Sequence, residues 1–206
     1  CKLPKRSGPA FLMNEITFEP KTHTYMRADG LVVPSVTQIL KATGCTQSSE
    51  FYTDEGRERG TRIHKYAEAI FNGDDEIEIV SEEDLGFVDG LIDFYESGLF
   101  EVMETETLVY NKALGYCGTA DLLARNAQTQ EPAIIDLKTG GVVDKSTALQ
   151  LTGYKLAFTP LENVRLYALQ CKGDGKYRLI EYTEDLTEVW KGAVEIYKWR
   201  KANGRL

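Results

Sequence analysis

Two aspartates occupy similar places in neighbouring segments of the chain. Asp121 follows Gly118-Thr119-Ala120, and Asp136 follows the apolar run Ala133-Ile134-Ile135. A carboxylate at the end of a buried strand is costly to desolvate unless a positive group meets it. Two adjacent carboxylates also raise each other's pKa unless a divalent cation lies between them. The pair therefore indicates a site for Mg²⁺ or Mn²⁺, hard cations that bind carboxylate oxygens.

A lysine accompanies the second aspartate. Lys138 lies two residues after Asp136, so the alternation of a strand places both side chains on one face of a sheet. An ammonium group beside a cation and a phosphate orients the attacking water and stabilises charge in the transition state. The alternative is an ordinary Asp–Lys ion pair at the end of a strand, because the tripeptide alone is common.

One of the two histidines lies in a predicted helix. Helical spacing places Gly60, His64 and Glu68 on one face of that helix. An imidazole ligand suits Mn²⁺ better than Mg²⁺. Taken alone, His64 also fits a half-buried, hydrogen-bonded histidine. His23, the other histidine, is interpreted as structural.

An amide and a phenol stand four residues apart after the Asp-x-Lys segment. Gln150 and Tyr154 share a face of the next predicted helix, from which they could bond Lys138, a water or a phosphate. The alternative is a solvated glutamine and a core tyrosine.

Apolar periodicity predicts the elements that position these residues. An N-terminal β-meander is expected at 16–18, 24–26 and 31–33, and a short helix opens at Pro34-Ser35. Further helices are expected at 54–72, 81–98, 146–158 and 184–203, and strands at 100–110, 117–125, 133–138, 164–170 and 176–182. In the helix that starts at Ser81, Ser81 and Asp84 fit a capping box, and the expected buried face is Leu85, Val88, Leu91, Ile92 and Tyr95.

This order predicts an α/β fold with a mixed central sheet flanked by helices. Residues 1–50 are expected to form an N-terminal β extension and short helix packed on the core, and residues 51–206 the core itself, in one compact domain overall.

Composition excludes several classes of protein. The chain has 206 residues, of which 42% are hydrophobic, so it is not expected to be disordered. A net charge of −8 means that binding to a polyanion requires a local basic patch or metal ions. No apolar run suits a membrane span, and no signal peptide is evident, so we expect a cytoplasmic protein without a membrane partner. The four cysteines, Cys1, Cys45, Cys117 and Cys171, are not spaced as zinc or iron–sulfur ligands.

Taken together, these motifs resemble the PD-(D/E)XK nuclease superfamily, in its RecB-like branch of phage and prokaryotic exonucleases. The resemblance covers about residues 56–170. It rests on a helical histidine, an aspartate on the second strand, an Asp-x-Lys on the third and a Gln-x-x-x-Tyr on the next helix, which are here His64, Asp121, Asp136 with Lys138, and Gln150 with Tyr154. The predicted order also matches the restriction-endonuclease-like αβββαβ core, and Pro34-Ser35-Val36-Thr37 resembles the opening of such exonucleases.

The resemblance implies a role for each matched residue. His64, Asp121, Asp136 and the carbonyl of Leu137 would bind Mg²⁺ or Mn²⁺, Lys138 would activate water, and Gln150 and Tyr154 would support the site and contact substrate. Glu68 and Glu106 are possible additional acids. Some relatives carry an iron–sulfur cluster, but the scattered cysteines here predict none.

The implied function is metal-dependent hydrolysis of DNA, foremost by an exonuclease of recombination, repair or phage DNA processing. The cell would be a bacterium or a phage-infected host, and a homo-oligomer or recombination and replication proteins are possible partners. The alternatives are an inactive nucleic-acid-binding or scaffold module on the same fold, and a structure-specific endonuclease.

Several side chains are expected to meet the DNA. The candidates for phosphate contact are Arg57, Arg59, Arg62 and Lys65, and those for base stacking are Phe51, Tyr52 and, less favoured than a core role, Tyr66. The C-terminal basic cluster of Lys198, Arg200, Lys201 and Arg205 is interpreted as a solvated face.

Overall fold

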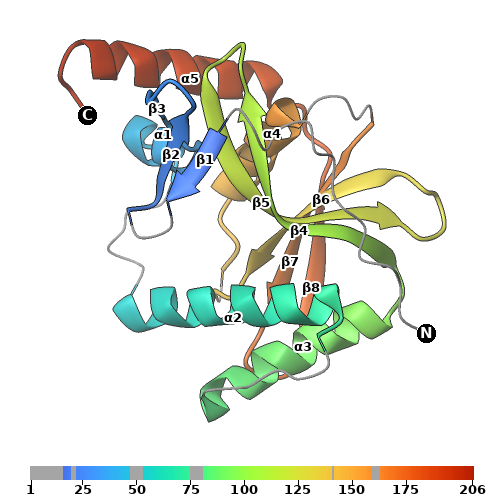
Figure 1. Cartoon of the computed structure of the whole chain (residues 1–206). Helices are drawn as coiled ribbons and strands as arrows, with labels where there is room; N and C mark the ends of the chain where they lie inside the picture. The colour runs from blue at the N-terminus through green and yellow to red at the C-terminus, as the bar shows by residue number, and fades with distance from the viewer. Residues whose placement is uncertain (1–15, 20–21, 47–52, 75–80, 141, 159–162) are drawn as a thin grey trace.

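A five-stranded mixed sheet forms the centre of the molecule (Figure 1). The computed structural model describes residues 16–19, 22–46, 53–74, 81–140, 142–158 and 163–206. The sheet runs in the order β4 (Phe100–Asn111), β5 (Tyr116–Asn126), β6 (Pro132–Lys138), β7 (Arg165–Cys171) and β8 (Tyr177–Tyr182). Only β6 and β7 pair in parallel among these strands. The predicted mixed α/β fold is therefore confirmed.

Helices cover both faces of this sheet. The side chains of Leu122 and Ile135 pack with α2 (Asp54–Asn72) and α3 (Leu85–Glu96). Their neighbours Leu123 and Ile134 point to the other face, where α1 (Val36–Thr43), α4 (Ser146–Ala157) and α5 (Thr187–Ala202) lie. The alternation along each strand thus divides the core into two layers. Figure 1 shows α2 and α3 on one side of the sheet and α5 on the opposite side.

A small antiparallel sheet precedes the core, as predicted. It consists of β1 (Ile16–Glu19), β2 (Thr24–Arg27) and β3 (Val32–Val33). Its buried residues Ile16, Tyr25 and Val33 pack against Tyr110 and Cys117 of the β4–β5 hairpin. The small sheet is therefore held against the part of the central sheet that continues into the site described below.

The boundaries of α2 follow local capping signals. Thr53 accepts a hydrogen bond from the backbone N–H of Gly56, and Gly73 ends the helix with a φ of 73°. A left-handed backbone conformation at this position costs little energy for glycine, because glycine has no Cβ. The predicted helix at 54–72 is confirmed.

The N-terminus and buried face of α3 differ from the prediction. Ser81 caps a single 3₁₀ turn, but Asp84 makes no capping hydrogen bond; its buried carboxylate pairs with Arg62 instead. The buried residues are Phe87, Val88, Gly90, Leu91 and Phe94, whereas Leu85, Ile92 and Tyr95 are exposed.

Close backbone contact explains the face that α3 buries. A Cβ on Gly86 would lie 2.0 Å from the carbonyl oxygen of Gly173, and one on Gly90 would lie 3.1 Å from that of Lys176. The helix therefore turns its glycines toward the β7–β8 hairpin, and Phe87 and Phe94 follow them into the core. A periodicity of large apolar residues detects Val88 and Leu91 of this face but not its glycines, which set the direction in which the helix is turned.

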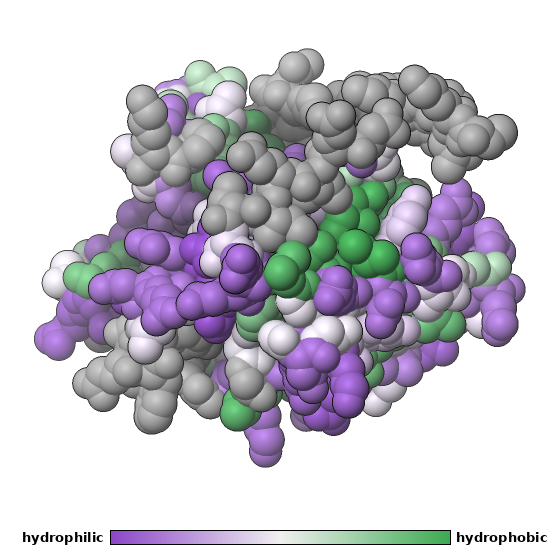
Figure 2. Space-filling view, turned by 90° about the horizontal axis from the view of Figure 1, so that it is seen from below, coloured by the Kyte–Doolittle hydropathy of each residue, from purple (hydrophilic) through white to green (hydrophobic). Residues whose placement is uncertain are grey.

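The surface on the side of α2 and α3 is mostly hydrophilic, with hydrophobic residues gathered in one part of it (Figure 2). In the part of the chain that the structure describes, no helix combines the length and the apolar character needed to cross a membrane.

Candidate active site

The two aspartates face each other where β5 and β6 separate. The ladder between these strands pairs Leu122 with Ile135 and stops there, so Asp121 and Asp136 are the next opposite positions in the same register. At that point the backbone N–H of Leu137 donates to Oδ2 of Asp121 at 2.6 Å. Opposite residues of an antiparallel pair share a face of the sheet. Both carboxylates therefore lie on one face, at the point where the strands part.

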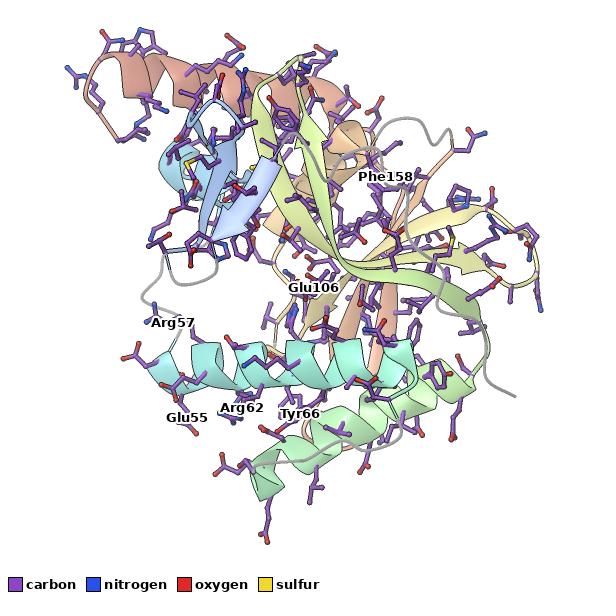
Figure 3. The ribbon with its side chains drawn as sticks, in the orientation of Figure 1. Glu55, Arg57, Arg62, Tyr66, Glu106 and Phe158 are labelled. Carbon is purple, nitrogen blue, oxygen red and sulfur yellow. The ribbon has the colours of Figure 1, made fainter. Side chains whose placement is uncertain are left out.

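Glu106 extends this row of acids onto a third strand. The residues on either side of Glu106 pair with Leu122 and Ala120, so Glu106 stands opposite Asp121 in the register of β4 and β5. Its φ of 47° is in the left-handed region, which few residues other than glycine adopt. Figure 3 shows Glu106 between the sheet and α2. Three neighbouring strands thus each contribute one carboxylate.

His64 reaches this row from α2. Its Nδ1 atom lies 3.4 Å from Oε1 of Glu106 and 3.7 Å from Oδ1 of Asp121. One ligand atom from each of these three residues lies within 4.8 Å of the others. One turn earlier, a Cβ on Gly60 would lie 3.7 Å from Oγ1 of Thr139, just beyond β6. A Cβ at this distance would make an ordinary van der Waals contact, so α2 lies close to the end of β6 at this point.

A chain of polar contacts holds Lys138 beside the acids. Its Nζ atom lies 2.6 Å from Oδ2 of Asp136 and 3.2 Å from Oε1 of Gln150. The Gln150 amide in turn donates to the hydroxyl of Tyr154 at 3.0 Å. A Cβ on Gly118 would lie 2.8 Å from the Tyr154 ring, so glycine at this position allows α4 to pack closely on β5. The position of the amine is therefore set by groups from a strand and a helix.

The electrostatics of the cluster reflect its crowded acids. Burial lowers the pKa of His64, but Asp121, Glu106 and Asp136 outweigh this effect and raise it to about 9. Burial raises the pKa of Asp121 to about 7, because the opposing effect of His64 does not cancel burial and the charge of Asp136 adds to it. Burial, with Asp136 and Asp121, also raises the pKa of Tyr154 well above its usual value. Tyr154 is consequently a neutral phenol at pH 7.

Among the described residues, His64, Glu106 and Asp121 offer ligand atoms close enough to one another for one divalent cation, and Asp136 stands opposite Asp121 in the register of β5 and β6. Oδ2 of Asp136 is buried and, among the described residues, accepts no hydrogen bond of good geometry, although Lys138 is close to it. The N–H and C=O of a strand residue point the same way. The carbonyl of Leu137 therefore points to the side on which its N–H meets Asp121. Carboxylate and carbonyl oxygens suit Mg²⁺ and Mn²⁺, and the imidazole favours Mn²⁺.

All these side chains line one cavity of about 250 Å³. The residues predicted from the sequence that meet there are His64, Glu106, Asp121, Asp136, Leu137, Lys138, Gln150 and Tyr154. The sequence analysis missed the opposite wall, to which the N-terminal region contributes His23, Tyr25, Ser35 and Thr37. Its available signals were the histidine beside an aromatic strand and the Pro34–Thr37 segment.

Other predicted site residues lie elsewhere. Glu68 is exposed on α2 and does not line the cavity. Arg62 makes two hydrogen bonds to the buried carboxylate of Asp84, at 2.6 and 2.9 Å, and Arg59 lies 5.0 Å over the Phe87 ring. Figure 3 shows Arg62 on the α3 side of α2, away from Glu106. Arg59 and Arg62 therefore hold α2 and α3 together.

The remaining nucleic-acid candidates are at the surface or outside the described residues. Arg57 pairs with Asp54 at 2.7 Å on the exposed first turn of α2, and Lys65 is exposed. Tyr66 is buried between α2 and α3, as its core interpretation predicts. Phe51 and Tyr52 lie outside the described ranges.

Comparison with known proteins leaves the function to be argued from this geometry. No family model matches the chain, and no curated protein matches it in sequence. A solved structure from Eubacterium rectale that carries the name "Putative exonuclease" is similar, with a TM-score of 0.42 over 86% of this chain and 77% of that chain, at 10% identity. A likeness at this level carries no argument about activity.

Proposed function

We propose that this protein is a metal-dependent nuclease that hydrolyses phosphodiester bonds in DNA. The observation that carries the proposal is the convergence of three carboxylates from neighbouring strands, one imidazole and one amine on a single cavity. An isolated Asp–Lys ion pair would not require Glu106 and His64 to meet the same acids.

The cation would be held by His64, Glu106, Asp121 and Asp136, with the carbonyl of Leu137 as a further ligand. When bound, Mg²⁺ or Mn²⁺ supplies positive charge that lowers the pKa of a water and offsets the charge of the phosphate. Binding would also relieve the repulsion that raises the pKa of Asp121.

The amine would act on the reacting phosphate. Lys138 lies on the same face as the acids, and its ammonium group can orient the attacking water and stabilise the charge that develops on the phosphate oxygens. Gln150 fixes the amine, and the neutral phenol of Tyr154 accepts a hydrogen bond from Gln150. Water would attack directly, without a covalent intermediate on the protein.

We favour an exonuclease of recombination, repair or phage DNA processing over a site-specific endonuclease. Sequence-specific cleavage would require an element that reads base edges in a groove. Of the described elements outside the αβββαβ order, the small β1–β3 sheet packs against the β4–β5 hairpin, and α5 packs against α1 and α4.

End-labelled linear duplex and closed circular DNA, each with Mn²⁺, Mg²⁺ or a chelator, test the proposal. We expect linear DNA to be degraded only with a cation, and circular DNA to persist. Asp136→Asn should abolish the activity, and Lys138→Met should lower kcat by about 10²–10³-fold. Lys198→Met is the matched control, because Lys198 forms an exposed ion pair with Glu195 at 2.7 Å on α5.

Three outcomes would contradict the proposal. They are intact linear DNA under every condition, an Asp136→Asn variant as active as the parent protein, and equal losses in the two lysine variants. DNA binding without hydrolysis would instead support the inactive binding module.

A further inference from the structure

The N-terminal sheet forms a second wall of the cavity that the proposed chemistry does not use. Its position relative to the acids is set by hydrogen bonds. The Tyr25 hydroxyl lies 2.8 Å from Oγ1 of Thr119, two residues before Asp121 on β5. The backbone N–H of Cys117 donates to the carbonyl of Pro34 at 3.0 Å. Groups on this wall are therefore held at a defined place beside the acids.

Three aromatic rings gather on this wall. Phe18 stacks on Tyr25 with ring centroids 4.6 Å apart, and the His23 ring meets both rings edge-on, at 5.1 and 5.9 Å. Tyr25 is buried, whereas His23 is exposed and Phe18 is 38% exposed. Neither Phe18 nor His23 belongs to the buried core clusters. Their rings thus keep accessible surface next to the cavity, which His23 lines.

The charges of the cavity favour the binding of DNA through aromatic ring surface. Of the described residues that line it, Lys138 is the only lysine or arginine, and it already contacts Asp136. Apart from the proposed divalent cation and its ligand His64, the described lining of the cavity therefore offers one amine to the two phosphate backbones of a duplex. Stacking of unpaired bases on aromatic rings tolerates any base and does not depend on charge.

We propose that Phe18 and His23 form a platform for an unpaired base beside the scissile phosphate, in which one ring stacks on the face of the base and the other, at 89° to the first, contacts its edge, so that the substrate is a single-stranded or frayed DNA end. This inference rests on the proposed nuclease function for the identity of the ligand. A base paired within a duplex does not expose its face for such stacking, so the platform distinguishes single-stranded from blunt-ended DNA.

Binding of single-stranded DNA carrying a terminal fluorescent base analogue tests the platform. The measurement uses the Asp136→Asn background with Ca²⁺ present, to prevent cleavage. Replacing Phe18 and His23 together by alanine should weaken binding of the single strand about tenfold, with blunt duplex binding unchanged. In the active protein the same pair should raise KM for single-stranded DNA and leave kcat nearly unchanged.

Two comparisons separate stacking from other roles. His23→Phe should retain affinity and His23→Gln should lose it, because only the former keeps a ring. Trp199→Ala is the matched control, since Trp199 is an exposed aromatic residue on α5 (59% exposed) and does not line this cavity. Unchanged melting temperatures would show that the small sheet still folds in each variant.

The result that overturns the inference is single-strand binding by the double variant equal to that of the parent, or equal losses for single-stranded and duplex DNA. Either result leaves the nuclease proposal standing if the parent protein degrades DNA. The reverse outcome is also distinguishable. If the parent protein degrades no DNA, but the double variant still binds single-stranded DNA more weakly than the parent does, the platform is supported and the nuclease function is contradicted.

Discussion

At the scale of single residues, two glutamates are candidates for the third acid of the site. Glu68 shares a helical face with His64, but one turn carries it about 6 Å further along the axis, and it is exposed. Glu106 comes from a strand 42 residues away and lies 3.4 Å from the imidazole. Register across β4 and β5, rather than spacing along α2, selects the acid that meets the histidine.

Conservative replacement of each glutamate tests this choice. Glu106→Gln should raise the Mn²⁺ concentration needed for half-maximal activity by at least about tenfold, since it removes a charged oxygen beside His64. Glu68→Gln should leave that concentration unchanged. Calorimetric titration of Mn²⁺ without DNA provides a second measurement. Equal responses of the two variants, or a response of Glu68→Gln alone, would remove Glu106 from the proposed site.

At the scale of helices and strands, close packing between these elements positions the site. Gly153 of α4 lies against Trp190 of α5, which is fully buried, and a Cβ there would be 2.9 Å from the indole ring. Gly192 of α5 has no atom within 4 Å of its Cβ position. The two glycines therefore occupy opposite environments on helices that pack together.

Alanine should have opposite effects at these two glycines. Gly153→Ala should lower the free energy of unfolding by about 1–3 kcal/mol through overpacking. Gly192→Ala should raise it by about 0.5–1 kcal/mol, because alanine favours a helix over glycine. Urea unfolding of both variants measures the difference. Stabilisation of both proteins would mean that α5 can move away from α4 at little cost.

The ion pair between α2 and α3 predicts a dependence of stability on pH. Hydrogen bonds from Arg62 lower the pKa of Asp84 below its usual value, even though burial opposes them. A lowered folded-state pKa contributes stability that is present above about pH 4 and is lost as the pH falls through the folded-state value. The effect therefore favours the folded protein at neutral pH and fades in acid.

Thermal unfolding of Asp84→Asn as a function of pH tests this contribution. At pH 7 the variant should melt roughly 5 °C or more below the parent protein. The gap should narrow below pH 4, as the parent loses the same charge. Asp54→Asn is the matched control, because the Asp54–Arg57 pair on the same helix is exposed. A gap that stays constant from pH 7 to pH 3 would rule out the ion pair as its source.

At the scale of the whole molecule, features that depend on residues near in the sequence are predicted correctly, and features that depend on distant residues are not. Thr53 and Gly73 bound α2 through local capping, and the spacing of Asp136 and Lys138 places them on one face by strand alternation. These features are readable from a few neighbouring residues. The buried face of α3 depends on the β7–β8 hairpin, about 85 residues away in the chain. The local pattern therefore identifies Val88 and Leu91 but also assigns three exposed residues, Leu85, Ile92 and Tyr95, to the buried face.

The residues of the site also fall into those that can be predicted from the sequence and those that cannot. Its two aspartates, lysine and histidine are recognisable from residue type and order. The N-terminal wall is not, because a β-meander of 18 residues contains no periodic signal for which larger structure it packs against. Cys117 and Thr119, which bond that wall, look like ordinary strand residues in the sequence.

Net charge sets the last constraint on function. The chain carries a net charge of −8, and three of its acids are neighbours in the cavity where DNA would have to bind. At physiological ionic strength, charges more than about 8 Å away are largely screened. Repulsion of DNA should therefore arise mainly from the acids of the cavity rather than from the total charge of the molecule.

Two double variants, one in the cavity and one on α5, distinguish the effect of local charge on DNA binding from the effect of total charge. In a chelator, Asp121→Asn with Asp136→Asn should bind DNA more tightly than the parent, since repulsion at the cavity is reduced. With Ca²⁺ the order should reverse, because only the parent can hold a cation between its acids and the phosphate. Above the pKa of about 7 of Asp121, Glu188→Gln with Glu195→Gln also removes two acidic charges, here on exposed α5, where both acids pair with lysines. This variant should follow the parent under both conditions. Fluorescence anisotropy at constant ionic strength measures all three proteins, and equal behaviour of the two double variants would show that total charge, rather than a cation site, governs DNA binding.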